Sequence, residues 1–100
     1  PFCDIILIGF NSLVEKEIIE VSNKVYNYLK NNLDGQDFMV LKPMPSPIDK
    51  IQNRFRWRII IKGNMSVEAN TIINKCLQNI YDASYKNTRV TVDVNPNSMI

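Results

Sequence analysis

Residues 44–63 read MPSPIDKIQNRFRWRIIIKG, and this stretch decides how the rest of the chain is arranged. Pro45 and Pro47 each have a fixed φ and no backbone N–H donor, so we expect this first part to be extended or turning and to lie outside the middle of any sheet. Residues 54–62 are rich in aromatic and β-branched side chains that alternate with a period of two, which predicts a β-strand. We expect residues 46–53 to form the loop that leads into it.

The predicted strand has two different faces, because successive side chains of a strand point in opposite directions. One face carries Arg54, Arg56 and Arg58, and the other carries Phe55, Trp57, Ile59 and Ile61. Residues 50–62 contain five basic residues and no acidic one, whereas the rest of the chain contains seven basic and ten acidic residues. The net charge of +2 is therefore the sum of a basic strip, residues 50–62, and a mildly acidic remainder of the chain. Such a strip attracts polyanions locally.

The other segments each predict one helix or strand. They are a buried strand over residues 1–10, a helix after Ser12, an edge strand over residues 37–43, a helix after Ser66 and a strand over residues 89–94. Ser12 and Glu15 have the spacing of a capping box, in which each side chain satisfies the other residue's free amide. Asn53 is a suitable residue for a left-handed turn position before the arginine strand.

The order β-α-β-β-α-β predicts an α+β fold, a two-layer sandwich of the ferredoxin-like kind. We expect a four-stranded antiparallel sheet whose first and third strands are central and whose two helices cover one face. Phe55 and Trp57 would then face the helices, and the arginines would line the open face. An apolar content of 45% over residues 1–100 suits one compact domain.

The sequence offers little for catalysis. It has no histidine, which is the usual general base and the commonest metal ligand, and it has no Gly-rich phosphate loop. Acylphosphatases resemble this outline, but that family needs an arginine in the loop after the first strand, and no arginine precedes Arg54. Cys3 and Cys76 are predicted to be reduced thiols. With no signal peptide and no long apolar run, a cytoplasmic protein is expected.

The basic strip is the best functional candidate. Arginines two residues apart on a strand are separated by roughly 6.6–6.8 Å, similar to the reach between successive phosphates of an extended single strand. The alternative is that these arginines only solvate an exposed sheet face and pair with Asp93 or Asp4. The aromatic residues alternate with the arginines, so core packing is favoured over base stacking for them. The predicted DNA-binding residues are Lys50, Arg54, Arg56, Arg58 and Lys62.

Three segments together resemble one protein family. Residues 42–48 (KPMPSPI), residues 53–63 (NRFRWRIIIKG) and residues 92–96 (VDVNP) are similar to the G-P-x-P-A-P-I, G-R-Y/W-R-W-Q and D-V-D-P motifs that close the primosomal protein N′ (PriA) family of bacterial replication-restart helicases. Pro1-Phe2 also resembles the Y-P-P-F junction of that family. The resemblance spans nearly all 100 residues in the correct order and spacing. The chain differs from these motifs at Lys42, Ser46, Asn53, Arg58 and Asn95, where the family has Gly, Ala, Gly, Gln and Asp.

This resemblance implies that residues 1–100 are the C-terminal domain of a much larger helicase, with an S10-like fold. The whole protein would use ATP and Mg²⁺ to unwind DNA with 3′-5′ polarity and would bear zinc in a separate insertion. None of those motifs lies in this chain, so we expect no catalytic residue, cofactor or metal site here. The implied partners are single-stranded or forked DNA, single-strand-binding protein, other primosome proteins and the rest of the helicase chain, with no membrane.

Two functions remain open from the sequence. The first is an accessory domain that contacts DNA through the basic strip and helps primosome assembly. The second is a structural or docking domain that does not bind DNA and instead packs on the helicase core or binds the acidic tail of single-strand-binding protein. A small-molecule regulatory domain is disfavoured, because the chain has no Gly-rich ligand loop.

Overall fold

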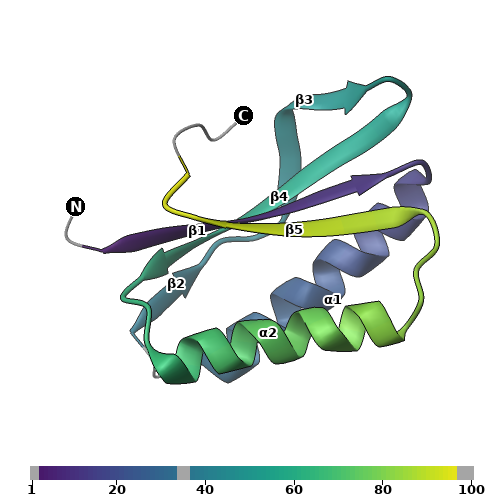
Figure 1. Cartoon of the computed structure of the whole chain (residues 1–100). Coiled ribbons are helices and arrows are strands. Elements are labelled where there is room, and N and C mark those ends of the chain that lie inside the picture. The colour runs from purple at the N-terminus through teal and green to yellow at the C-terminus, as the bar shows by residue number, and fades with distance from the viewer. Residues whose placement is uncertain (1–2, 34–36, 97–100) are drawn as a thin grey trace.

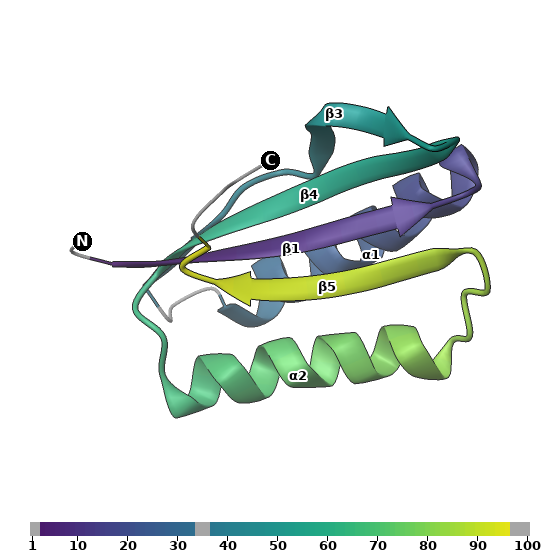
Figure 2. The same ribbon diagram turned by 45° about the horizontal axis from the view of Figure 1, so that its top comes forward.

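The computed structural model describes residues 3–33 and 37–96, and for residues 47–51 it describes the backbone alone. The elements in chain order are β1 (Asp4–Ser12), α1 (Glu15–Leu33), β2 (Phe38–Val40), β3 (Met44–Ile51), β4 (Arg54–Gly63), α2 (Val67–Asp82) and β5 (Thr88–Val94). The strands form one antiparallel sheet, and both helices cover the same face of it (Figures 1 and 2). The predicted α+β class and two-layer ferredoxin-like arrangement are therefore confirmed.

The two long strands β1 and β4 lie in the centre of the sheet, as predicted. The order is β2-β4-β1-β5, and β3 also pairs with β4. Strand β2 pairs only with residues 61–63 of β4, and β3 pairs with residues 54–58 of the same strand. Strands β2 and β3 therefore share one edge of β4, and β5 forms the opposite edge of the sheet.

Strand β3 is the element that sequence reasoning missed. The expected loop over residues 46–53 was wrong for residues 46–51, which belong to β3, and the sheet has five strands where four were predicted. An edge strand tolerates proline because one of its sides needs no N–H donor. The pairing is also irregular between Pro45 and Lys50, so the prolines lie in a distorted part of the ladder. Gln52 and Asn53 complete a two-residue turn, with φ of 54° and 63°.

The core lies between the sheet and the two helices. Its buried side chains are Ile6, Ile8 and Phe10 of β1, Ile59 and Ile61 of β4, Ile18, Val21, Val25, Leu29 and Leu33 of α1, and Ala69, Ile73 and Cys76 of α2. Phe55 and Trp57 pack against this cluster, which confirms their predicted orientation. Burial of so much aliphatic surface is the main favourable term for a domain of this size.

Helix α1 begins differently from the prediction. Ser12 lies at the end of β1, and its hydroxyl accepts a hydrogen bond from the Val14 N–H (3.1 Å), so the predicted capping box with Glu15 is not formed. Thr88 of β5 donates a hydrogen bond to the same hydroxyl (2.8 Å). Ser12 is fully buried and ties the two strands together at the point where the chain turns into α1. In contrast, Ser66 is the N-cap of α2 as predicted and accepts from Ala69 N–H.

Candidate nucleic-acid interface

The arginines of β4 lie on the sheet face opposite the helices. Ile59 and Ile61 are buried beneath the helices, and the alternation of the strand turns Arg54, Arg56 and Arg58 the other way. All three arginines are half-buried. Their long aliphatic stems can lie along the sheet, and the Nε atom of Arg58 is buried.

Arg54 is anchored to the neighbouring strand. Its Nε donates a hydrogen bond to Oδ1 of Asn11, which projects from β1 on the same face. The first arginine of β4 is therefore held in place by a hydrogen bond to the neighbouring strand. Anchoring lowers the entropy that this side chain would lose on binding an anion.

A hollow opens in the centre of this face, and we call it the Gly9 hollow. Its volume is about 320 Å³. It is lined by Leu7, Gly9, Phe10 and Asn11 of β1, Ser46 of β3, Arg56, Trp57 and Arg58 of β4, and Arg89, Thr91 and Asp93 of β5. Among the lining residues that the structure describes, three are arginines and one is an aspartate, so their summed charge is positive.

Gly9 keeps the hollow open. A Cβ atom at this position would lie 2.9 Å from Oγ1 of Thr91, closer than ordinary van der Waals contact. The absence of a side chain leaves the backbone of β1 as the floor between the arginines of β4 and the side chains of β5. Arg58 is the direct cross-strand partner of Gly9 on one side, and Thr91 is its partner on the other.

Arg89 is the basic residue of this site that sequence reasoning missed. Asn11 pairs with Arg56 on β4 and with Arg89 on β5, so the two arginines flank Asn11 in one row across three strands. Arg89 lies 31 residues beyond Arg58 in the chain, outside the basic strip. The alternation of the last strand showed that it faces outward, but only the strand order and register bring it to the others.

The structure does not bring Lys62 into this group. Lys62 is exposed at the far end of β4, where it lines a second hollow with Cys3 and Phe38. It is four residues from Arg58, which corresponds to roughly 13 Å along a strand. The paired residues Leu7 and Ile60 lie between them. For Lys50, the fifth predicted residue, the structure describes only the backbone, which pairs with Phe55.

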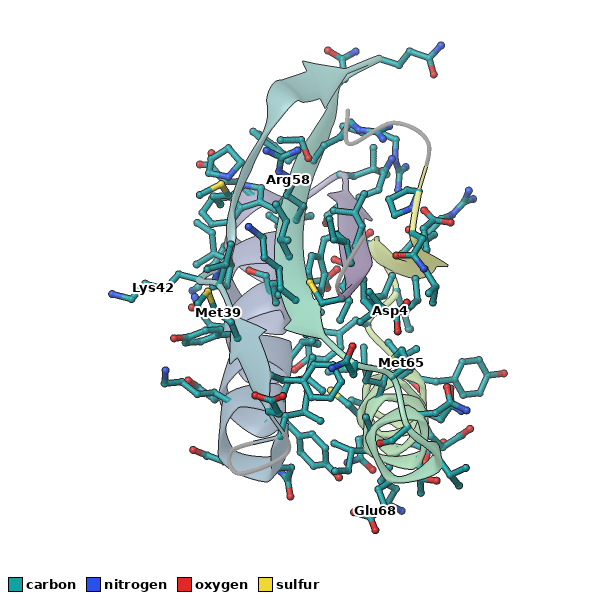
Figure 3. All side chains as sticks on the ribbon, turned by 90° about the vertical axis from the view of Figure 1, so that its left-hand side faces the viewer. Asp4, Met39, Lys42, Arg58, Met65 and Glu68 are labelled. Atoms are coloured by element: carbon teal, nitrogen blue, oxygen red, sulfur yellow. The ribbon has the colours of Figure 1, made fainter. Side chains whose placement is uncertain are left out.

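The two aspartates that could have paired with the arginines are placed differently. Asp93 lines the Gly9 hollow. Asp4 lies beside Met65, at the corner where β1 meets the segment before α2 (Figure 3). Its carboxylate accepts hydrogen bonds from the Asn95 side-chain amide (3.0 Å) and the Met65 N–H (2.9 Å). Both hydrogen bonds lower the pKa of Asp4, and the bond from Asn95 has the larger effect.

A larger groove runs along the other edge of the sheet, between α2 and β5. Its volume is about 980 Å³. The lining includes the apolar side chains Leu77, Ile80, Tyr81 and Val90 and the basic residues Lys86 and Arg89. Among the described residues, no further strand pairs with the outer side of β5.

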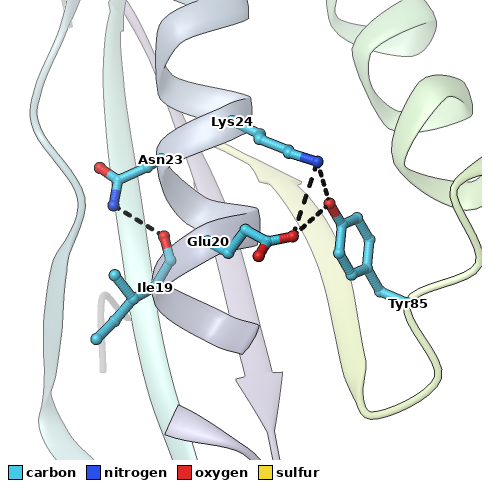
Figure 4. A network of polar contacts seen from close by, with 5 residues as sticks. All are labelled: Ile19, Glu20, Asn23, Lys24 and Tyr85. Carbon is cyan, nitrogen blue, oxygen red and sulfur yellow. Dashed lines mark hydrogen bonds and ion pairs between the residues drawn. The ribbon is translucent and has the colours of Figure 1, made fainter. Parts of the chain in front are cut away.

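The side chain of Tyr85 connects the loop after α2 to α1 beside this groove. Its hydroxyl accepts a hydrogen bond from Lys24 and donates one to Glu20 (2.9 Å), and Lys24 and Glu20 form an ion pair at 3.7 Å (Figure 4). The hydrogen bond with Tyr85 is the main reason why the pKa of Lys24 is raised. Unlike the exposed Tyr81, Tyr85 is half-buried and packs against the core.

Both cysteines are free, and burial raises the pKa of the Cys76 thiol to about 11. Residues 3–33 and 37–96 contain no group of three His, Cys, Asp or Glu side chains that could hold a metal ion. Across the same ranges, neither helix is both long enough and apolar enough to span a membrane.

Comparison with known proteins points to one family. Residues 1–97 match the family model described as the primosomal protein N C-terminal domain. The chain is also 29% identical, over 80 residues, to the replication restart protein PriA of Bacillus subtilis (strain 168), with 79% of this chain aligned. It spans only 10% of the length of that relative.

Two solved structures share the fold. The de novo designed protein Foldit4 superposes with a TM-score of 0.70, at 12% identity, over 96% of this chain and 99% of its own. The de novo designed protein LFR1 1, described as having a ferredoxin fold, gives a TM-score of 0.60 at 13% identity over 97% and 88% of the two chains. At such identities the likeness shows the fold alone.

Proposed function

Because this chain belongs to the primosomal protein N C-terminal domain family, we propose that it is an accessory domain of a replication-restart helicase that contacts single-stranded or forked DNA and helps the primosome to assemble. The contact would be made through the basic sheet face. Arg54, Arg56 and Arg58 would bind phosphates, with Lys50 and Lys62 as further candidates.

The observation that supports DNA contact best is the position of Arg56 and Arg58. Both lie on the sheet face opposite the helices, and both line one open hollow. Arginine binds phosphate oxygens through two parallel N–H···O bonds, which makes it the preferred side chain for such a surface. Phe55 and Trp57 would hold the strand to the core while the arginines face the ligand.

The proposal assigns no catalytic step to this chain. ATP-driven unwinding, with its Mg²⁺, and any zinc site would belong to other parts of a longer protein, of which this chain would be a C-terminal part. The rest of that protein, single-strand-binding protein and other primosome proteins would be its protein partners, and its location would be cytoplasmic.

A second candidate function is docking without DNA contact, and the groove between α2 and β5 favours it. An apolar lining beside a sheet edge is suited to an extended peptide, which can add to the edge and place side chains in the groove. Lys86 and Arg89 at its rim would favour an acidic segment, such as the tail of single-strand-binding protein, or an acidic surface of the helicase core.

Fluorescence anisotropy with labelled oligothymidylate distinguishes the two functions. The wild-type chain and the variant Arg56→Ala/Arg58→Ala are titrated at about 50 and 200 mM salt. DNA contact predicts weak binding that falls with salt, and a salt slope that is lower by about 1.4 in the variant, since each single-strand phosphate contact contributes about 0.7.

A control variant with the same loss of charge is Lys16→Ala/Lys75→Ala. Both lysines are exposed, one on each helix, away from the basic face. This variant should bind almost as well as wild type. Equal binding by all three proteins, or no binding by wild type at about 50 mM salt, would refute DNA contact and leave docking as the better function.

A further inference from the structure

Resting on the proposed DNA contact, we infer that the Gly9 hollow is the seat of a phosphate group of single-stranded DNA, with Arg89 as an additional phosphate ligand. The strand would therefore cross the sheet from β4 over β1 to β5. It would not follow β4 toward Lys62, as the basic strip in the sequence suggests.

The register of the sheet brings the required groups together. Asn11 separates Arg56 from Arg89 in one row, and neighbouring strands are 4.7–4.9 Å apart, so the two backbones are separated by roughly 10 Å. Arginine side chains that start from opposite sides of such a gap are long enough to converge above its centre. Asn11 occupies the middle of this row, and Gly9, the next residue of β1 on the same face, leaves space beside it.

The chemistry of the lining fits a phosphodiester. Arg56, Arg58 and Arg89 provide forked donors of fixed positive charge, and Thr91 adds a hydroxyl. The Oδ1 atom of Asn11 is bonded to Arg54, so the remaining hydrogen-bonding end of its amide is the NH₂ group, a donor. Of the described lining residues, Asp93 alone is acidic, and it lies on the β5 side of the hollow.

The size of the hollow favours one nucleotide unit. About 320 Å³ is at the small end of the range for ligand sites in proteins. A site of this size can take a phosphate and its sugar from a flexible single strand, whose backbone can bend into a depression of the sheet. The rest of the strand would lie over the exposed part of the face.

Lys62 is the natural comparison because it has the same charge and belongs to the same predicted strip. It is separated from the hollow by the apolar pair Leu7 and Ile60. A path along β4 requires Lys62 and does not require Arg89. A path across the strands requires the opposite.

The test compares Arg89→Ala with Lys62→Ala in the same anisotropy titration. We expect Arg89→Ala to weaken binding about five- to tenfold at about 50 mM salt, which is the effect of one lost phosphate contact, and Lys62→Ala to stay within about twofold of wild type. Arg89→Lys should recover most of the binding, because a point charge still attracts the phosphate. Circular dichroism of each variant checks that the fold is kept.

A double-mutant cycle adds a second, independent readout. If Arg56 and Arg89 bind one phosphate, the loss caused by Arg56→Ala/Arg89→Ala should be clearly smaller than the product of the two single losses. Wild-type binding by Arg89→Ala, an equal loss in Lys62→Ala, or multiplicative effects in the cycle would each overturn the inference.

The outcomes also separate this inference from the proposed function. Binding that depends on Arg56 and Arg58 but not on Arg89 overturns the path across the strands and leaves DNA contact in place. Binding that depends on none of these arginines, or no binding by wild type, overturns both.

Discussion

Asn53 has a backbone conformation that most residues avoid. Its φ is 63°, in the left-handed region, where asparagine and glycine are the best-tolerated residues. The family motif has glycine here, so asparagine is a mild replacement, and the two-residue turn between β3 and β4 is preserved. The sequence did predict this feature, because asparagine before a strand is a recognisable turn signal.

We expect Asn53→Ala to lower the free energy of unfolding by about 1 kcal/mol, because a Cβ without a compensating polar group is strained at positive φ. Asn53→Gly should be at least as stable as wild type. Urea unfolding followed by Trp57 fluorescence measures both. Gln52→Ala is the control, since Gln52 already carries a long side chain at a φ of 54° and should change little. Equal stability of Asn53→Ala and Asn53→Gly would contradict this explanation.

Asp4 should make stability depend on pH in the acidic range. Hydrogen bonds from Asn95 and Met65 lower its pKa below the usual 3.8, so the unfolded chain binds the proton more tightly than the native protein. The contribution of Asp4 is therefore complete above about pH 5 and is lost as the pH falls through the lowered pKa.

In Asp4→Asn this contribution is absent, so we expect the variant to be less stable than wild type at pH 7 and the difference to shrink steadily toward pH 3. Urea unfolding of both proteins at several pH values gives the difference directly. If the difference in free energy of unfolding stayed constant over the whole pH range, the negative charge of Asp4 would not contribute to stability.

At the scale of elements, the sequence predicted α1 and α2 and the strands β1, β2, β4 and β5, because their apolar side chains follow the pattern set by burial against one core. It did not predict β3. The prolines of that segment argue against a central strand, and the sequence alone does not show that the first part of β4 has an open edge where a distorted strand can pair. The capping box at the start of α1 was also misread, because the Ser12 hydroxyl accepts from the Val14 N–H and from Thr88 of β5.

The Tyr85 hydroxyl attaches the loop between α2 and β5 to α1, beside a second hydrogen bond from the Asn87 N–H to the Glu17 carboxylate (3.2 Å). Tyr85→Phe keeps the packed ring and removes the bonds to Lys24 and Glu20. We expect the pKa of Lys24 to fall toward its ordinary value and the amide protons of the 83–87 loop to exchange faster. Nuclear magnetic resonance titration and hydrogen exchange measure these two effects.

Tyr81→Phe is the matched control for this element. Tyr81 is 79% exposed and makes none of these contacts, so its hydroxyl should be dispensable. A pKa of Lys24 that is the same in wild type, Tyr85→Phe and Tyr81→Phe would contradict the assigned role.

At the scale of the whole molecule, the candidate site could be predicted only in part. Arg54, Arg56 and Arg58 are close in sequence and share a face by simple alternation, so the sequence identified them. Arg89 joins them only because β1 is inserted between β4 and β5 with a particular register. Lys62 belongs to the strip in sequence but is separated from the arginines in space. Neighbouring residues in the sequence therefore reveal the charge on one strand, but the charged surface is built from several strands whose order the sequence does not show.

The hydrogen bonds between Asn95 and the start of β1 have one more consequence. Asn95 N–H donates to the Ile5 carbonyl (2.6 Å) and Ile5 N–H donates to Oδ1 of Asn95 (2.9 Å), so β5 ends beside the point where β1 begins. A short linker there would turn β5 and β1 into an ordinary hairpin, and the chain could be opened instead in the 83–87 loop. Such a circular permutant would keep every strand pairing and both helices. The pairing between β5 and β1 therefore does not depend on which of the two strands comes first in the chain.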